Sequence, residues 1–248
     1  MKSTSWQNSA KWYQENVGEE GHYYHRHVIL PELLKKIPKD ARLLDLACGQ
    51  GVLGRQVPTT VIYQGIDIAP DLIKYAKTQD KNPQHQYLVQ DATKPFNLKK
   101  KFNLATIVLA IQNIDPLDAL FQNVKDHLES GGELLIVMNH PCFRIPRQSS
   151  WDIDESKKIQ FRRLDRYLTP LTIPIKTHPG KNESVETLSF HRPLTSYVQA
   201  LFQAGFSITE MDEWISNKES TGPKAKMENR AREEFPLFLF IKAKYLQK

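Results

Sequence analysis

Two carboxylates and three glycines near the start of the chain have the types and spacing of a nucleoside-binding site. The glycines Gly49, Gly51 and Gly54 follow an apolar run and fit the pattern G-x-G-x-x-G. Asp45 precedes this loop, and Asp67 ends the next apolar run, where a carboxylate can accept hydrogen bonds from both hydroxyls of a ribose. Glycine lets the backbone approach a ligand where a Cβ would collide. An acidic residue before the loop suits a ligand without phosphates better than a dinucleotide.

Two more predicted strands bring polar residues to the same place. The run 86–90 is followed by Asp91 and Ala92, and the run 104–110 continues into the polar stretch 111–114. Ligands of open α/β sheets bind beyond the carboxyl ends of the strands, so these residues are expected to lie beside the glycine loop. An aspartate just past a strand can also serve only as a helix N-cap, and this alternative stays open for Asp91.

With these elements in order, the chain resembles the class I S-adenosylmethionine-dependent methyltransferases, whose first motif reads acidic-x-x-x-G-x-G. The stretch 104–114 looks like that of the ubiquinone/menaquinone C-methyltransferase group, with Asn103 where many members have aspartate. The resemblance implies S-adenosylmethionine as cofactor, Asp67 on its ribose and Asp91 at its adenine amino group. It implies further cofactor contacts from the residues of these motifs: Asp45, Ala47, Cys48, Gly49, Gly51, Ile68, Ala92 and Ala110.

The elements that must position these residues alternate along the chain. Helices are predicted at 52–57, from Pro70, from Asp115–Pro116 to Gly131–Gly132, and from Pro193 to Gly205. Strands alternating with helices predict a Rossmann-like α/β three-layer sandwich with a mostly parallel seven-stranded sheet. The resemblance implies that its last strand is antiparallel.

A chain of 248 residues fits one methyltransferase-like domain. The N-terminal region is rich in aromatic residues at helical spacing; Tyr13, Tyr23 and Tyr24 either close over the cofactor or acceptor, or pack in the core. The domain divides into an N-terminal helical cap (1–40), a cofactor-binding core (41–138), a substrate-binding insertion or lid (139–192) and the C-terminal part of the core (193–248).

Composition excludes several other classes of protein. Hydrophobic residues make up 40% and charged residues 25% of the chain, and no apolar stretch approaches the ~20 residues that span a bilayer. The first residues lack the apolar core of a signal peptide, so we expect a cytoplasmic protein without membrane insertion. Cys48 and Cys142 are expected to be free thiols. His22, His25 and His27 have no companions at zinc-like spacing, so no metal is expected.

The insertion 139–192 is long for a connection in this fold and is expected to face the transferred methyl group. Its segments 158–164 and 185–190 alternate like strands and predict a small antiparallel lid. The segment 222–234 either covers the site as well or is a solvated helix.

Histidines at the two ends of the insertion are candidate general bases. An acceptor hydroxyl, phenol or acidic carbon must lose a proton, and histidine titrates near neutral pH. His140, directly after the strand 133–138, is the first candidate, and His191 and His25 are further ones. For His140, a hydrogen bond to the loop backbone is an equally favoured interpretation.

Arginines in the insertion indicate an anionic substrate, because guanidinium binds carboxylate and phosphate in a forked geometry. Surface salt bridges are the alternative interpretation for part of this cluster, which comprises Arg144, Arg147, Arg162, Arg163 and Arg166. The candidate substrate-binding residues are Tyr24, His25, Asn113, Arg144 and Arg147.

Together these features predict an S-adenosylmethionine-dependent methyltransferase acting on a small anionic molecule. The net charge of +6 and the basic insertion leave an RNA methyltransferase as the alternative, although acidic residues are interleaved with the basic ones. The glycine pattern alone would also fit a nicotinamide-dependent oxidoreductase. A non-catalytic protein that keeps the cofactor fold is the remaining interpretation.

Overall fold

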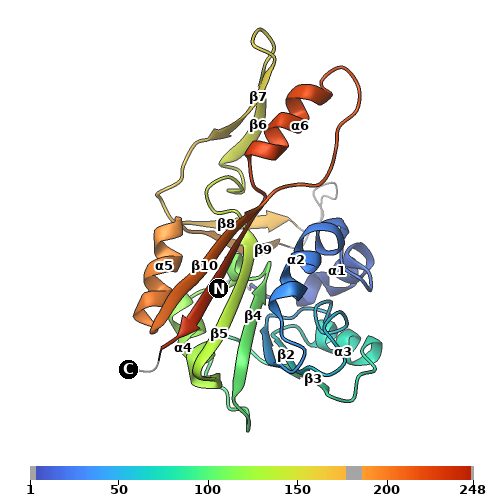
Figure 1. Cartoon of the computed structure of the whole chain (residues 1–248), viewed down its shortest axis with the longest axis vertical. Helices are drawn as coiled ribbons and strands as arrows, with labels where there is room; N and C mark the ends of the chain where they lie inside the picture. Colours follow the sequence, from blue (N-terminus) through green and yellow to red (C-terminus); the bar gives the residue numbers. More distant parts are fainter. Residues whose placement is uncertain (1–3, 177–185, 247–248) are drawn as a thin grey trace.

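Seven strands form one sheet at the centre of the computed structural model, in which residues 4–176 and 186–246 are described (Figure 1). They are β1 (Arg42–Leu46), β2 (Ile62–Asp67), β3 (His85–Val89), β4 (Phe102–Val108), β5 (Leu128–Asn139), β10 (Phe206–Trp214) and β11 (Phe238–Tyr245). Their order is β10-β11-β5-β4-β1-β2-β3. β11 runs antiparallel to both neighbours, and the pairs from β5 to β3 are parallel. The predicted Rossmann-like fold with an antiparallel last strand is therefore confirmed.

Helices cover both faces of the sheet, which explains why its inner strands are apolar on both sides. The helical elements are η1 (Gln7–Ser9), α1 (Ala10–Val17), the π-helical turn η2 (His25–Ile29), α2 (Leu30–Leu33), η3 (Leu34–Lys36), α3 (Pro70–Gln79), η4 (Ile111–Asn113), α4 (Leu117–His127), α5 (Leu194–Gln203) and α6 (Ala225–Glu234). One core packs α4 and α5 against the sheet, and a second packs the N-terminal helices and α3 against the opposite face. No helix in the described part of the chain has the length and apolarity needed to cross a bilayer.

Two predicted helix boundaries differ from the structure. The segment after the glycine loop forms successive turns instead of a regular helix, although Arg55 N and Val57 N still donate to the carbonyls four residues back. α4 ends at His127, before Gly131–Gly132, because the next residues already pair with β4 as part of β5. The glycine pair thus lies inside a long, irregular strand and does not stop the helix.

The insertion folds as two hairpins. β6 (Ser149–Asp154) pairs with β7 (Ile159–Leu164), and β8 (Leu171–Lys176) pairs with β9 (Glu186–His191), both antiparallel. The predicted strands 158–164 and 185–190 correspond to β7 and β9. They do not pair with each other, as a single antiparallel lid would require. Val185 of the second prediction lies outside the described residues.

The two hairpins occupy different places relative to the sheet. Figure 1 shows the β6–β7 hairpin projecting beyond the sheet with α6 beside it, and β8–β9 crossing the carboxyl ends of the strands. α6 buries Met227 and Ala231 and packs on β7, while Lys224 at its start pairs with Glu155 of the hairpin. It therefore covers the projecting hairpin and not the carboxyl edge of the sheet.

Candidate cofactor and acceptor site

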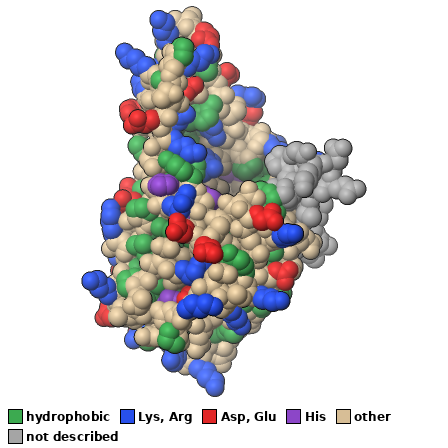
Figure 2. Space-filling view, turned by 90° about the vertical axis from the view of Figure 1, so that its right-hand side faces the viewer, with side chains coloured by type: hydrophobic (Ala, Val, Ile, Leu, Met, Phe, Trp, Pro, Cys, Tyr) green, Lys and Arg blue, Asp and Glu red, His purple; other side chains and the backbone are tan. Residues whose placement is uncertain are grey.

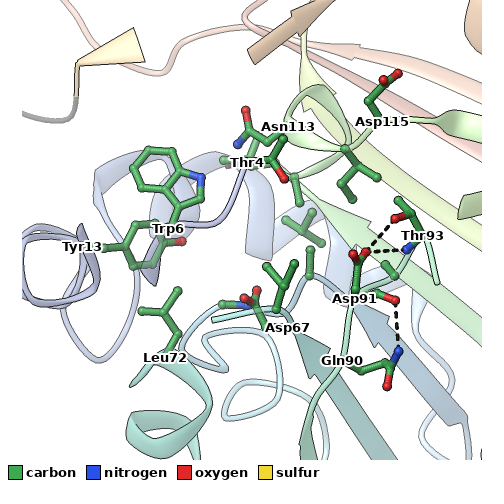
Figure 3. Close-up of a pocket in the computed structure, with 18 residues that line it drawn as sticks. Thr4, Trp6, Tyr13, Asp67, Leu72, Gln90, Asp91, Thr93, Asn113 and Asp115 are labelled. Carbon is green, nitrogen blue, oxygen red and sulfur yellow. Dashed lines mark hydrogen bonds between the residues drawn. The ribbon is translucent and has the colours of Figure 1, made fainter. Parts of the chain in front are cut away.

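A cavity of about 170 Å³ opens at the carboxyl ends of the parallel strands (Figure 3). The residues after β1, β2, β3 and β4 supply its floor and one wall, and the N-terminal segment supplies the opposite wall. Its lining consists of Thr4, Trp6, Tyr13, Ala47, Gly49, Asp67, Ile68, Leu72, Gln90, Asp91, Ala92, Thr93, Val108, Leu109, Ala110, Asn113, Ile114 and Asp115. The structure thus brings together most of the cofactor-binding residues predicted from the sequence.

Asp67 at the end of β2 holds the loop that follows β1. Its Oδ2 accepts a hydrogen bond from Gly49 N at 2.8 Å, and its Oδ1 accepts one from Ala69 N at 2.8 Å. Gly49 has φ +56, a left-handed conformation that glycine adopts without strain. Burial raises the pKa of Asp67, and the backbone N–H bonds oppose that shift. Each oxygen keeps a second lone pair, so the carboxylate can still bind a ligand's hydroxyls in the cavity.

The second glycine of the loop, Gly51, faces the protein interior. A Cβ on Gly51 would lie 2.8 Å from Oη of Tyr87, and Gly51 has φ +75. Cys48 also points away from the main cavity, since a Cβ on Gly65 of β2 would meet its Sγ at 2.8 Å. Gly51 and Cys48 therefore do not line the cofactor cavity, and the glycine at 51 serves the packing of the loop on Tyr87. Cys48 and Cys142 are both free cysteines.

Asp45 lies beneath the loop and not in the cavity lining. Its carboxylate accepts hydrogen bonds from Tyr63 Oη at 2.6 Å and Thr106 Oγ1 at 2.8 Å. Burial raises its pKa to about 6, against the lowering effect of these two donors. It lines a second, smaller cavity of about 30 Å³, which shares Tyr13 and Ala47 with the main one. Asp45 can therefore influence this end of the site electrostatically without being part of the main wall.

Opposite the N-terminal wall, Asp91 is fixed by the turn that follows β3. Its Oδ1 accepts hydrogen bonds from Thr93 N and Thr93 Oγ1, both at 2.8 Å. Figure 3 shows Asp91 and Thr93 on one side of the cavity, Trp6 and Tyr13 on the other, and Asp67 between them. Trp6 and Tyr13 meet edge to face with ring centroids 5.6 Å apart. A flat, polar-edged ligand therefore fits between an aromatic wall and two carboxylates.

The histidines predicted as bases do not line this cavity. His140 is buried; its Nδ1 accepts from Cys142 N at 3.2 Å, and its Nε2 pairs with Glu213 Oε1 at 2.7 Å. Because both ring nitrogens are engaged, the geometry does not support His140 as a base. His25 lines the smaller cavity beside Asp45, and burial lowers its pKa to about 3. His191 donates from Nε2 to Tyr167 O at 2.6 Å, and burial lowers its pKa.

Of the predicted substrate-binding residues, only Asn113 lines the main cavity. Arg144 donates to Asn139 Oδ1 at 2.7 Å and lies over the ring of Phe238; it lines two cavities, one beside η4 and one beside Trp151 and Phe235. Tyr24 packs on Phe238 and its hydroxyl lies 3.3 Å from Ser216 Oγ.

Arg147 is exposed and donates to Pro174 O, so it contributes to the surface of the β8–β9 hairpin. Sequence reasoning did not single out Thr4, Trp6, Gln90 or Asp115 of the main cavity, or Gln112 and Arg192 behind it. Thr4 and Trp6 reach the site from the N-terminal segment and Arg192 from the end of β9, so strand and loop patterns give no signal for them, whereas Gln90, Gln112 and Asp115 lie in or beside the predicted stretches 86–90 and 111–114. No group of three His, Cys, Asp or Glu residues within 4–176 and 186–246 is arranged to hold a metal ion.

Comparison with known proteins agrees with this fold and site. A family model described as a methyltransferase domain matches residues 18–210. A crystal structure of an S-adenosylmethionine-dependent methyltransferase from Mesorhizobium loti is 25% identical, with 86% of this chain and 96% of that chain covered and a TM-score of 0.66. One from Clostridium acetobutylicum is 17% identical, with 98% and 99% covered and a TM-score of 0.60. An uncharacterized protein of Haemophilus influenzae is 23% identical over 237 residues, which cover 88% of this chain and 87% of that protein.

The sheet order and the cavity at its carboxyl edge define a class I methyltransferase fold. The chain belongs to the methyltransferase-domain family, and it is an S-adenosylmethionine-dependent methyltransferase whose cofactor is S-adenosylmethionine. This finding replaces the nicotinamide-dependent interpretation of the glycine pattern. The residues present fit the cofactor, because the cavity combines an aromatic wall with two carboxylates at the ends of adjacent strands.

Proposed function

We propose that the enzyme transfers the methyl group of S-adenosylmethionine to a small acceptor that carries an anionic group. The observation that supports this most is Arg144, which is partly buried close to the carboxyl ends of β4 and β5. It bonds only to neutral groups, Asn139 Oδ1 and Leu237 O, and no ion pair with a carboxylate exists for it among the described residues. A partly buried cation without a counter-ion loses part of its hydration, and an anionic ligand offsets that loss.

For the cofactor, the proposal assigns the ribose hydroxyls to Asp67 and the adenine amino group to the outward oxygen of Asp91. The loop at Ala47 and Gly49 then lies under the methionine part, beside Tyr13 and Ala110. Ile68 and Ala92 complete the apolar faces around the adenine. Asp45 and Asp67 place negative charge near the sulfonium, which favours binding of that cation.

S-adenosylmethionine supplies a methyl group on a positively charged sulfur, which a nucleophile displaces in line. The chain's residues must therefore place the acceptor atom behind that methyl group and exclude water. Asn113 and Ala110 border the cavity where β4 ends and are positioned to contact the acceptor. The similarity of 104–114 to the ubiquinone/menaquinone C-methyltransferase group makes an activated carbon one candidate acceptor atom, beside oxygen and nitrogen.

His191 is the best placed of the candidate bases. Its Nε2 donates to Tyr167 O, which leaves Nδ1 with the lone pair, and Nδ1 has no hydrogen-bond partner among the described residues. Burial lowers the pKa of His191, so the ring is neutral at pH 7 and able to accept a proton. It lines the cavity that also contains Arg144. We therefore assign the removal of an acceptor proton to His191 and not to His140.

RNA is the second candidate acceptor, favoured by the net charge of +6. Several basic residues of the insertion and α6 are neutralised locally, because Arg163 pairs with Asp165 and Lys224 with Glu155. Figure 2 shows Lys and Arg side chains interspersed with Asp and Glu over the displayed face. RNA binding requires a continuous basic surface, so these pairings favour the small acceptor.

A matched acceptor screen tests the proposed function. Purified enzyme with S-adenosylmethionine is offered small carboxylic acids and phosphates, the methyl ester or amide of each acid, and transfer RNA, and release of S-adenosylhomocysteine is measured. We expect turnover with acids and not with their neutral counterparts. The variant His191→Gln should lower kcat with an acceptor hydroxyl while S-adenosylhomocysteine binding stays unchanged. Turnover with neutral acceptors or RNA alone would contradict the proposal.

A further inference from the structure

A small cavity adjoins the cofactor cavity along segment 112–115. It has a volume of about 30 Å³ and sits between η4, the loop after β5 and the end of β9. Segment 112–115 borders both cavities: Gln112 lines the small one, and Asn113, Ile114 and Asp115 line the cofactor cavity. Its polar lining includes Gln112, Arg144, Ser189, His191 and Arg192.

Two buried polar atoms of this lining have no hydrogen-bond partner. Arg192 is 9% exposed, and its Nη2 donates to Ile114 O at 2.9 Å and Asp115 Oδ1 at 2.5 Å. Its Nη1 has no hydrogen-bond partner within the described residues, although the guanidinium lies near the hydroxyl of Tyr197. The side chain of Gln112 donates from Nε2 to Leu109 O at 2.7 Å, and its Oε1 is also without a partner. Buried polar groups are nearly always hydrogen-bonded. The two atoms therefore indicate that a bound group supplies the hydrogen bonds that the described residues do not make.

The two unpaired atoms have opposite requirements. Nη1 of Arg192 needs an acceptor, and Oε1 of Gln112 needs a donor because its amide nitrogen is committed to Leu109. Arg144 adds a second guanidinium whose hydrogen bonds go to neutral groups. A simple anion satisfies the arginines but places an acceptor beside another acceptor at Gln112. An anion with a neighbouring O–H or N–H satisfies all three side chains.

We propose that this cavity binds the polar end of the methyl acceptor, and that this end is a carboxylate with an adjacent hydroxyl or amine, as in a 2-hydroxy acid or 2-amino acid. This inference rests on the proposed function. A water-sized atom needs roughly 10–15 Å³ by this measure, so the cavity of about 30 Å³ has room for the two carboxylate oxygens and the adjacent donor atom, and the remaining skeleton of the acceptor lies outside it. The carboxylate pairs with Arg192 and Arg144, and the adjacent donor pairs with Gln112.

The binding of small probe molecules tests this assignment, and the test does not require turnover. The enzyme saturated with S-adenosylhomocysteine is titrated with glycolate, acetate and ethylene glycol at constant ionic strength, and dissociation constants are taken from NMR chemical-shift changes. We expect glycolate to bind about tenfold tighter than acetate, the effect of one added hydrogen bond. Ethylene glycol, which lacks the charge, should not bind measurably.

Three variants separate the contributions. Gln112→Met should remove the advantage of glycolate and leave the affinity for acetate unchanged. Arg192→Met should weaken both acids, and Arg192→Lys serves the same purpose if loss of the Asp115 ion pair prevents folding. The control Arg163→Met changes an exposed arginine of β7 that pairs with Asp165, and it should bind both acids like the wild type.

Equal affinities for glycolate and acetate, or losses in Arg163→Met as large as in Arg192→Met, would overturn the inference and assign the two unpaired atoms to a bridging water. The proposed function fails separately, if only neutral acceptors or RNA are methylated in the acceptor screen. Methylation of anionic acceptors without any preference for glycolate would leave the proposed function standing and refute only this subsite.

Discussion

The replacement Asp67→Asn gives the sharpest test of the cofactor site. Each oxygen of the Asp67 carboxylate accepts one backbone N–H at 2.8 Å and keeps one lone pair for a ribose hydroxyl. Asparagine retains one such oxygen, while its NH₂ group faces a backbone N–H and cannot accept from the ribose. One hydrogen bond to a charged group is lost, about 1.5–3 kcal/mol, so the affinity for S-adenosylhomocysteine should fall about 10- to 100-fold.

We expect Asp67→Asn to change the thermal stability of the protein less than its affinity for S-adenosylhomocysteine. Burial already disfavours the charged form of Asp67, as its raised pKa indicates, so a neutral amide relieves part of that cost and offsets the mismatched N–H. Calorimetric titration with S-adenosylhomocysteine measures the affinity, and thermal unfolding of the same samples measures stability. Asp118→Asn, an exposed carboxylate in the first turn of α4, is the control. An unchanged affinity in folded Asp67→Asn would refute the assignment of this carboxylate to the cofactor.

Three further predictions concern the surroundings of the cofactor. Because burial raises the pKa of Asp45 from 3.8 to about 6, its protonated form favours the folded state, and its contribution to the unfolding free energy should fall by about 2 kcal/mol as pH rises from 4 to 7. Urea titrations of wild type and Asp45→Asn across that range should diverge accordingly; parallel curves would contradict this. Gly51→Ala should destabilise the protein by about 1–3 kcal/mol more than Gly18→Ala, since both have positive φ but only the Cβ at 51 meets Tyr87 at 2.8 Å; equal losses in denaturant titrations would show that backbone strain alone decides. Asp91→Ala should weaken S-adenosylhomocysteine about tenfold and leave S-inosylhomocysteine, which lacks the adenine amino group, unaffected; equal weakening of both ligands would remove the adenine assignment.

Local patterns predicted the parts of the site that lie on the parallel strands. Asp67 and Asp91 follow apolar runs, and the carboxyl ends of parallel strands meet at one edge of a sheet. Their neighbourhood therefore follows from strand order without knowledge of any side-chain contact. The same reasoning placed the starts of α3 and α5 correctly, because prolines mark them in the sequence.

Side chains in the insertion were harder to predict, because their partners are distant in sequence. His140 looks like an available base in the sequence, but its partner Glu213 lies 73 residues away in β10. The strand-like segment 158–164 pairs with 149–154 and not with β9, a choice between registers that alternation of apolar residues does not distinguish. Arg192 and Gln112 approach each other only because β9 crosses the end of β4.

The sequence by itself determined the class of protein. Alternating strands and helices, the loop at Gly49 and the carboxylate at Asp67 are sufficient for the fold and the cofactor, since both depend on local conformation and strand order. Only the tertiary structure decided which polar groups remain unpaired, and these define where an acceptor can bind. Hydrogen bonds from distant segments engage both ring nitrogens of His140 but only Nε2 of His191, and their formation depends on the packing of the whole chain.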